Sequence, residues 1–146
     1  MTPLFLVCRV GTVLCALPVE RVVETMRPMP VEAWAGAPPC VRGVSIIRGV
    51  PVPVVDAARL INEEATEPRR FVVVQAGDRD VALAVNEVLG VRAMSAGSMV
   101  GLPPLLRDAT VDVVTAIGTL DAHLLLVLES MSILPQSVRE TFGAVA

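Results

Sequence analysis

The side chains that could perform catalysis are few and scattered in this sequence. His123 is the only histidine, and it lies in the segment Leu-Asp-Ala-His-Leu at residues 120–124. A hydrolytic enzyme would need Cys40 or Ser45 as nucleophile and His123 as general base, yet nothing in the sequence orients such a base. The surroundings of His123 are typical of a turn or a strand edge. The sequence therefore predicts a protein that is not an enzyme.

Motifs for phosphates, cofactors and metals are absent from the sequence as well. There is no Gly-x-Ser-x-Gly, Walker or dinucleotide-binding sequence, and no helix start follows the glycine pair Gly43 and Gly49. All 12 basic residues are arginine, which excludes lysine chemistry. The cysteines Cys8, Cys15 and Cys40 are odd in number and widely spaced, unlike a disulfide framework or a zinc site. We expect no cofactor and no metal.

Composition narrows the class of protein further. Hydrophobic residues make up 53% of the 146 residues, and the mean hydropathy is +0.66. No apolar run approaches the roughly 20 residues that span a bilayer, and no basic segment precedes the first apolar residues as in a signal peptide. The net charge is −3 and aromatic residues are 3%, which argues against nucleic-acid binding. These features predict a cytoplasmic protein with apolar contact surfaces and no membrane insertion.

The first half of the chain recurs in the second half. Phe5 opens a valine-rich stretch that returns at Phe71, an offset of 71 − 5 = 66. The same offset pairs Gly11 with Gly77, Ala16 with Ala82, Leu17 with Leu83, Val19 with Val85 and Val22 with Val88. Residues 52–56 align with residues 125–129 at an offset of 125 − 52 = 73. Two similar units predict duplicated substructures, with Phe5 and Phe71 at matching places.

Short segments rich in valine and isoleucine, separated by Gly, Pro and Asp, indicate β-strands. Hairpins are expected at residues 4–17, 41–55, 70–85 and 113–129, helical turns at 20–24 and 86–91, and a terminal helix at 135–142. Roughly ten strands in a two-by-five arrangement predict a mainly β protein made of two small barrels packed together.

We expect one domain spanning residues 1–146, which contains two barrel subdomains. The first barrel would cover about residues 4–62 and the second about residues 69–135, with the polar stretch between them as the crossover. Terminal strands of one barrel could also complete the other.

The most distinctive segment covers residues 41–56 and reads Val-Arg-Gly-Val-Ser-Ile-Ile-Arg-Gly-Val-Pro-Val-Pro-Val-Val-Asp. It resembles the CheW-like adaptor family of bacterial chemotaxis, whose motif is apolar-x-Gly-x-x-Asn-Leu-Arg-Gly, then an apolar stretch with Pro and a closing Asp. The matching residues are Gly43, Arg48, Gly49, Pro53 and Asp56. Further segments at residues 17–24, 82–89 and 124–134 extend the resemblance over about residues 4–135, most of the chain.

Three positions depart from the family pattern. Ile46 stands where the family favours Asn, Ala57-Ala58 replaces Leu-Arg, and Asn86 replaces Asp. The first change removes a polar group beside Arg48, and the last removes a charge near the turn of the second unit. We therefore expect partner preferences that differ from those of a standard adaptor.

The resemblance implies two five-stranded, Src-homology-3-like barrels around a shared core, and a role without catalysis. Such adaptors connect the cytoplasmic helical tip of methyl-accepting chemoreceptors to the regulatory domain of a CheA-like histidine kinase, at membrane-associated receptor arrays. The alternatives are an adaptor for a non-flagellar pathway, such as twitching motility or development, and a small-ligand sensor that uses the groove between the barrels.

The resemblance also implies a set of protein-interaction residues: Val22, Glu24, Gly43, Arg48 and Gly49. Val22 and Gly43 would line a receptor-facing groove; the alternative is that Val22 is an ordinary core residue and that Gly43 permits the strands to cross closely. Glu24 and Arg48 have opposite charges in apolar segments, so we expect them to pair across neighbouring strands. The pair would then aim Arg48 at a partner protein.

Overall fold

The computed structural model describes residues 2–64, 67–95, 99–101 and 113–134, which are almost entirely β-structure. The strands are β1 (Leu4–Val10), β2 (Val13–Pro18), β3 (Val22–Met26), β4 (Val41–Ile47), β5 (Val50–Asp56), β6 (Arg70–Ala76), β7 (Arg79–Val85), β8 (Glu87–Ala93), β9 (Met99–Gly101), β10 (Val114–Leu120) and β11 (His123–Leu128). Short helical turns are η1 (Val19–Arg21), α1 (Ala57–Leu60) and η3 (Ser130–Ser132). The predicted helix at residues 135–142 lies outside the described residues.

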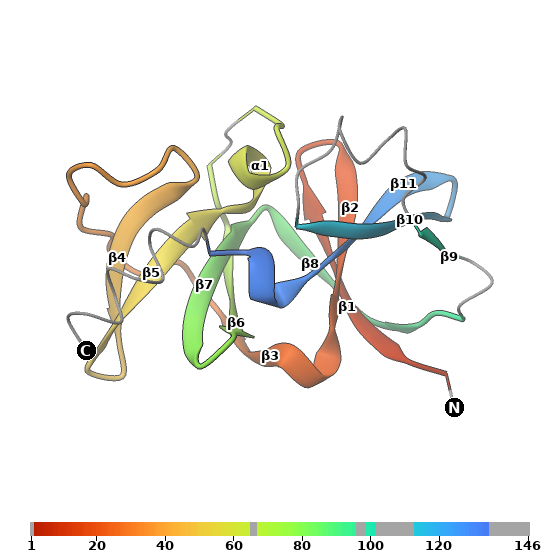
Figure 1. Ribbon diagram of the computed structural model, residues 1–146, viewed down its shortest axis with the longest axis horizontal. Helices are drawn as coiled ribbons and strands as arrows, with labels where there is room; N and C mark the ends of the chain where they lie inside the picture. The colour runs from red at the N-terminus through yellow and green to blue at the C-terminus, as the bar shows by residue number, and fades with distance from the viewer. Residues whose placement is uncertain (1, 65–66, 96–98, 102–112, 135–146) are drawn as a thin grey trace.

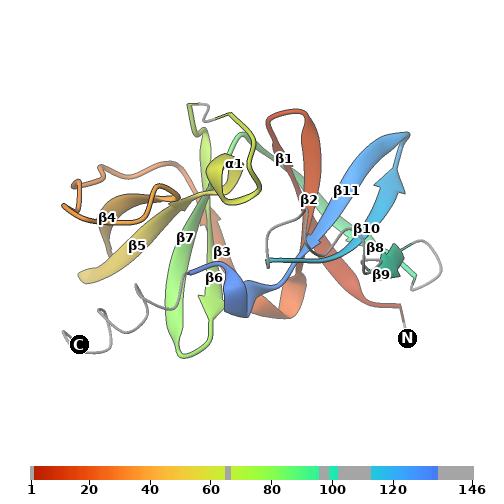
Figure 2. The same cartoon turned by 45° about the horizontal axis from the view of Figure 1, so that its top comes forward.

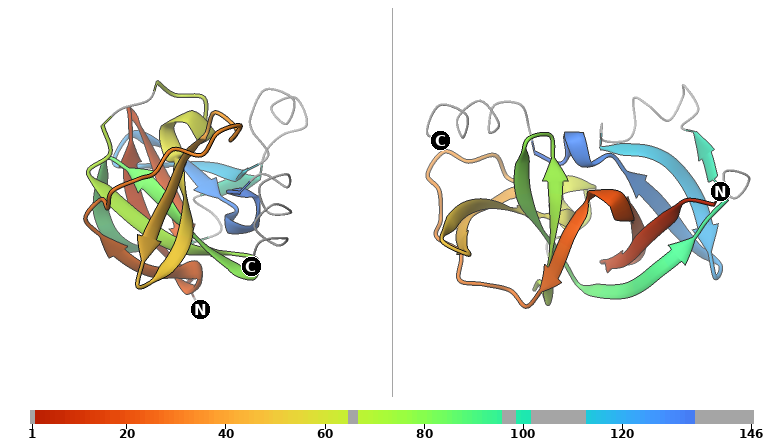
Figure 3. Two further views of the ribbon diagram at one scale, coloured as in Figure 1. Left: turned by 90° about the vertical axis from the view of Figure 1, so that its left-hand side faces the viewer. Right: turned by 90° about the horizontal axis from the view of Figure 1, so that it is seen from below.

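The strands form two curved sheets that lie side by side along the long axis of the molecule (Figure 1). One sheet has the order β3-β6-β7-β5-β4, and the other has the order β8-β1-β2-β11-β10-β9. Each curls into a barrel-like lobe, and the two lobes remain distinct when the molecule is seen from below (Figure 3). The prediction of a mainly β protein with two small barrels is confirmed, and the short strand β9 extends the second sheet.

Each sheet takes one hairpin from the other half of the chain. The β1–β2 hairpin lies beside β11, and the β6–β7 hairpin lies beside β5. Both of these junctions are parallel, so a tight turn cannot make them and the chain must cross between sheets. The expected contiguous boundaries, about residues 4–62 and 69–135, therefore do not coincide with the two sheets.

Three hydrophobic clusters account for this arrangement. One fills the first lobe around Phe71, and a second fills the other lobe around Phe5. The third and largest contains alternate residues of the same strands, including Leu6 and Val72, and joins the two sheets. Because strand residues alternate between faces, β1 and β6 each serve one lobe with one face and the shared core with the other.

The duplication seen in the sequence is present in the packing. Phe5 and Phe71 are both buried in the cores of their own lobes, and each has a valine two residues later in the same cluster. Further cluster members related by the sequence offsets are Ala16 with Ala82, Leu125 with Val52, and Val127 with Val54. The prediction that the two phenylalanines occupy matching environments is confirmed.

The junction of the lobes is covered by α1, which follows directly from β5 (Figure 2). Asp56 begins this helix by accepting a hydrogen bond from the backbone N–H of Ala58 at 3.1 Å. Its other carboxylate oxygen lies 3.0 Å from the Arg42 guanidinium. The aspartate of the central motif therefore has a structural role at the end of β5. Within the described part of the chain, no helix is long and apolar enough to cross a membrane.

Candidate functional site

The tip of the β4–β5 hairpin consists of Arg48 and Gly49, and both have positive φ angles, 54° and 78°. Two consecutive residues of this kind form a type I′ turn, whose twist matches that of the flanking strands. Glycine adopts this conformation readily, whereas an arginine there carries backbone strain. The turn places the Arg48 side chain at the open end of the first lobe, where it is 75% exposed.

Arg48 is held by Glu24 of β3. Its guanidinium donates a hydrogen bond of 2.7 Å to the Glu24 carboxylate, which raises the pKa of Arg48 and keeps it charged. The predicted pairing of Glu24 with Arg48 is thus confirmed. The two residues are not on neighbouring strands, however, because β3 and β4 are opposite edges of the sheet. The ion pair therefore connects the two edges across the mouth of the lobe.

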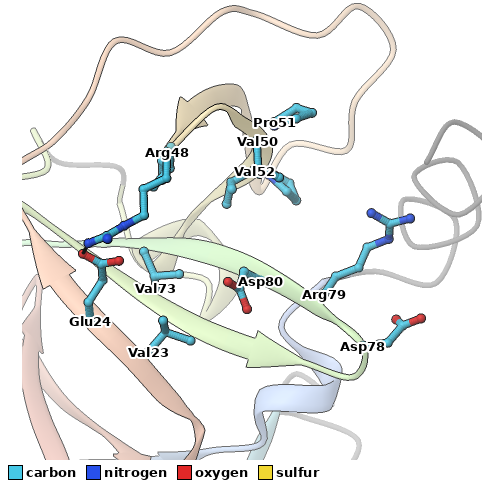
Figure 4. A pocket seen from close by; sticks show the side chains of 12 residues that line it. Val23, Glu24, Arg48, Val50, Pro51, Val52, Val73, Asp78, Arg79 and Asp80 are labelled. Atoms are coloured by element: carbon cyan, nitrogen blue, oxygen red, sulfur yellow. Dashed lines mark hydrogen bonds and ion pairs between the residues drawn. The ribbon is translucent and has the colours of Figure 1, made fainter.

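A pocket of about 670 Å³ opens beside this ion pair, and we call it the first mouth. Its apolar walls come from β3, β4, β5 and β6, where Val23, Ile47, Val52 and Val73 line it. Arg48 and Glu24 lie on one side, and the β6–β7 turn brings further charged side chains to the other (Figure 4). Among the residues that the structure describes, the charged ones that line it are Glu24, Arg48, Asp78, Arg79 and Asp80.

Large apolar side chains remain exposed around the first mouth. Val50 and Val23 line it and are 56% and 46% exposed, respectively. Ile46 is also 56% exposed; it pairs with Pro51, which lines the mouth, but it is not itself a lining residue. An apolar surface with a few charged groups is the composition of a protein-binding patch. Of the three departures from the family pattern, Ile46 is thus the one that leaves a large apolar side chain exposed next to this surface.

Gly43 has a structural task that explains its residue type. Its φ is 147°, and a Cβ atom there would overlap the carbonyl of Glu32. The backbones of Glu32 and Val44 exchange two hydrogen bonds of 2.9 Å at this point. Gly43 therefore permits the loop before β4 to pair with β4 itself. A larger residue at this position would disturb the fold, so a bulky substitution such as Gly43→Arg would not report on binding alone.

Val22 begins β3 opposite Val74 and packs, half-buried, against the shared core. Neither Val22 nor Gly43 is among the residues that line the first mouth. The structure thus groups Glu24 and Arg48, with Gly49 at the same turn, and places the other two predicted residues elsewhere. Sequence reasoning missed Val23 and Val50. The only signal for them in the sequence is a valine close to a charged residue, which is common in β-strands and therefore weak.

The other departures from the family pattern are structural. Ala57 and Ala58 are buried in the shared core, where larger side chains would need space. The side-chain oxygen of Asn86 accepts a hydrogen bond of 2.7 Å from the backbone N–H of Gly11. The backbone N–H of Asn86 donates a hydrogen bond to the carbonyl of Arg9. Asn86 therefore fixes the turn of the β1–β2 hairpin. The sequence suggested that asparagine in place of aspartate removes a charge and thereby alters partner preference. The structure shows instead a contact of Asn86 within the protein.

The second lobe has an equivalent but smaller opening of about 220 Å³. Several of its lining residues correspond to those of the first mouth at offsets of 66 or 73: Leu89 to Val23, Val7 to Val73, Asp121 to Arg48 and His123 to Val50. At the tip of its hairpin, an aspartate thus replaces the arginine. The two lobes therefore present tips of opposite charge.

The residues of a hydrolytic site are not assembled. His123 lies at the opening of the second lobe, and its Nδ1 is 2.9 Å from the carbonyl oxygen of Asp121. Ser45 lies in the other sheet, buried in β4, and donates a hydrogen bond to the carbonyl of Pro30. Partial burial raises the pKa of the Cys40 thiol, which opposes a nucleophilic role. Among the residues with described positions, no three His, Cys, Asp or Glu side chains converge on a metal site.

Comparison with known proteins agrees with this architecture. A family model described as the CheW-like domain matches residues 4–138. A solved structure, the scaffolding protein TtCheW from Thermoanaerobacter tengcongensis, aligns with a TM-score of 0.78 over 88% of this chain and 90% of that one. The two sequences are 19% identical, so this likeness concerns the fold. The comparison with curated proteins finds no match.

Proposed function

Because this chain belongs to the CheW-like domain family, we propose that it is a non-catalytic scaffold that couples chemoreceptors to a sensor histidine kinase. The kinase would contribute its regulatory domain, and the receptor would contribute its cytoplasmic helical tip. The scaffold would then work in the cytoplasm, at membrane-associated receptor arrays. The proposal applies equally to flagellar chemotaxis and to a twitching or developmental pathway, since both need this coupling.

The observation that carries the proposal is the charged tip of the first mouth. Arg48 is exposed, yet its guanidinium is oriented by Glu24, and exposed Val23 and Val50 lie beside it in the same mouth. An arginine can bind carboxylates and carbonyl groups with its planar fork while its stem packs on apolar surface. Arginine is also enriched at the energetic centres of protein interfaces. The mouth is thus suited to a protein partner with an acidic group and an apolar contact.

Glu24 adds a constraint on how such a partner would bind. Its side chain is 26% exposed, so it orients Arg48 from beneath and leaves the other guanidinium donors available to a partner. A side chain that is already oriented loses less conformational entropy on binding than a free one. Glu24 is therefore proposed as a positioning residue, and Arg48 as the contact. Gly49 permits the turn that presents it.

The experiment is a pull-down of the regulatory domain of a CheA-like histidine kinase with Arg48→Glu and with wild-type protein. We expect the variant to lose at least ten-fold in affinity, because the new carboxylate would face both Glu24 and the acidic group of the partner. Arg59→Glu is the matched control, since Arg59 is exposed in α1, beyond the opposite end of β5. Equal loss in both variants, or full binding by Arg48→Glu, would contradict the assignment of the first mouth.

A further inference from the structure

Two cysteines face each other across the β1–β2 hairpin. The strand register places Cys8 directly opposite Cys15, and both have free thiols. Both are fully buried, and both belong to the core shared by the two lobes. Because opposed residues in an antiparallel pair point to the same side of the sheet, the two thiols lie on one face.

The spacing of this pair suits a disulfide bond. Pro18 lies opposite Phe5 and has no N–H, so that pair cannot exchange two backbone hydrogen bonds. Since the two kinds of pair alternate along an antiparallel ladder, Cys8 and Cys15 form a hydrogen-bonded pair, with Cα atoms about 5.5 Å apart. Disulfides join cysteines whose Cα atoms are about 4.4–6.8 Å apart. The Cα spacing therefore lies within the disulfide range, and the two side chains must draw closer for the sulfur atoms to bond.

The internal duplication shows that packing does not require cysteine here. At the offset of 66, Cys8 corresponds to Val74 and Cys15 to Val81. These valines are also directly opposite each other, on β6 and β7, and both are fully buried in the same shared core. The same structural position thus accepts a pair of ordinary apolar residues. What distinguishes the first unit is the chemistry of two adjacent thiols.

We propose that Cys8 and Cys15 are a redox-responsive pair that a two-electron oxidant converts, in the folded protein, into a cross-strand disulfide. Each thiol loses its hydrogen as the sulfur–sulfur bond forms. Two protons and two electrons pass to the oxidant: hydrogen peroxide is reduced to water, an alkyl hydroperoxide to an alcohol and water, and the azo bond of diamide to a hydrazine. The bond would fix the hairpin at the core that joins the two lobes.

The environment of the pair determines how fast the bond forms and breaks. Burial raises the pKa of both thiols to about 12, so little thiolate is present and oxidation must wait for brief opening of the hairpin. Side chains at hydrogen-bonded pairs are farther apart than at the other pairs, so the bridge would carry some strain. Strained disulfides are reduced easily. The pair is therefore expected to oxidise slowly and to return readily to the thiol form.

The test uses the full-length protein, oxidised with diamide in native buffer. After the diamide is removed, the remaining thiols are alkylated in denaturant, and the intact mass is measured. We expect a monomer that has lost two hydrogens and carries one alkyl group, mapped to Cys40 by peptide analysis. Mild treatment with dithiothreitol should restore all three alkylation sites.

The variant Cys15→Val is the matched control, because Val81 occupies the equivalent position in the second unit. The variant Cys8→Val is a second control, because Val74 is the residue equivalent to Cys8. Each should keep two alkylation sites and form no internal bridge. Three alkylated thiols in the oxidised wild-type protein would overturn the proposal. A bridge that includes Cys40, or one that forms only in denaturant, would overturn it as well.

Discussion

At the scale of single residues, backbone strain at the hairpin tips distinguishes the two lobes. Arg48 and Gly49 form one tip, and Asp121 and Ala122 form the other, all with positive φ. Ala122 has a φ of 66°, which an alanine adopts only at a cost of about 1–2 kcal/mol. Glycine occupies the equivalent position in the first lobe. The second tip thus contains strain that a single substitution can relieve.

We predict that Ala122→Gly stabilises the protein by about 0.5–1 kcal/mol. This net value is the strain energy that is relieved, minus the entropic cost of the greater flexibility of glycine in the unfolded chain. The matched change Gly49→Ala should destabilise it by about 1 kcal/mol. No atom lies within 4 Å of a Cβ at Gly49, so this loss would come from the backbone alone. Urea denaturation of both variants measures the two effects. Shifts of the same sign would contradict the turn geometry.

Gly43 presents a different case, because its neighbours leave no space for a side chain. We predict that Gly43→Ala lowers the free energy of unfolding by roughly 2–4 kcal/mol, since the backbone pairing of Glu32 with Val44 must separate. Thermal melting by circular dichroism is a direct measurement. An unchanged melting temperature would show that the loop before β4 adapts, and would make Gly43 available again as a binding residue.

At the scale of elements, the β1–β2 hairpin depends on a residue far away in the sequence. Asn86 holds its turn through the hydrogen bond from Gly11, which an aspartate could also accept. We predict that Asn86→Ala costs about 1–2 kcal/mol of stability, because the Gly11 N–H loses its partner. Asn86→Asp should cost less, since it keeps an acceptor for the Gly11 N–H while it loses the 3.4 Å bond to the carbonyl of Glu67. Equal losses, measured by urea denaturation, would mean that the Gly11 bond contributes nothing.

Local patterns predicted most hairpins because turn chemistry and valine content are local signals. Residues 86–91 were expected to form a helical turn, but Glu87–Ala93 is the strand β8. Its apolar and polar residues follow neither the helical repeat nor the alternation of a strand clearly, and pairing with β1 decides its structure. The exchange of hairpins between sheets also depends on distant pairing, of β2 with β11 and of β5 with β7. No local pattern specifies such a partner.

The candidate site was also predictable only in part, because local sequence signals can be read and contacts between distant segments cannot. Opposite charges in apolar segments predicted the contact between Glu24 and Arg48, although not that it joins two sheet edges. The apolar walls of the first mouth come from β3, β4, β5 and β6, which only the fold brings together. The role of Asn86 was hidden because its contact lies 75 residues away in the sequence.

At the scale of the whole molecule, the shared core makes the two lobes interdependent. It contains residues of both sheets, and the only tryptophan, Trp34, packs against it. We predict one cooperative unfolding transition, because exchanged hairpins prevent either lobe from forming alone. Tryptophan fluorescence and far-ultraviolet circular dichroism should give the same urea midpoint. Two separated midpoints would show that the lobes unfold independently.

The central claim is that one molecule connects a receptor to a kinase. The most direct measurement mixes the purified protein with the kinase regulatory domain and a soluble receptor-tip fragment, and follows complex formation by analytical ultracentrifugation. We predict a complex containing all three proteins, which is absent when the chain is omitted and weakened by Arg48→Glu but not by Arg59→Glu. Sedimentation of the chain apart from both partners, at concentrations well above micromolar, would contradict the account.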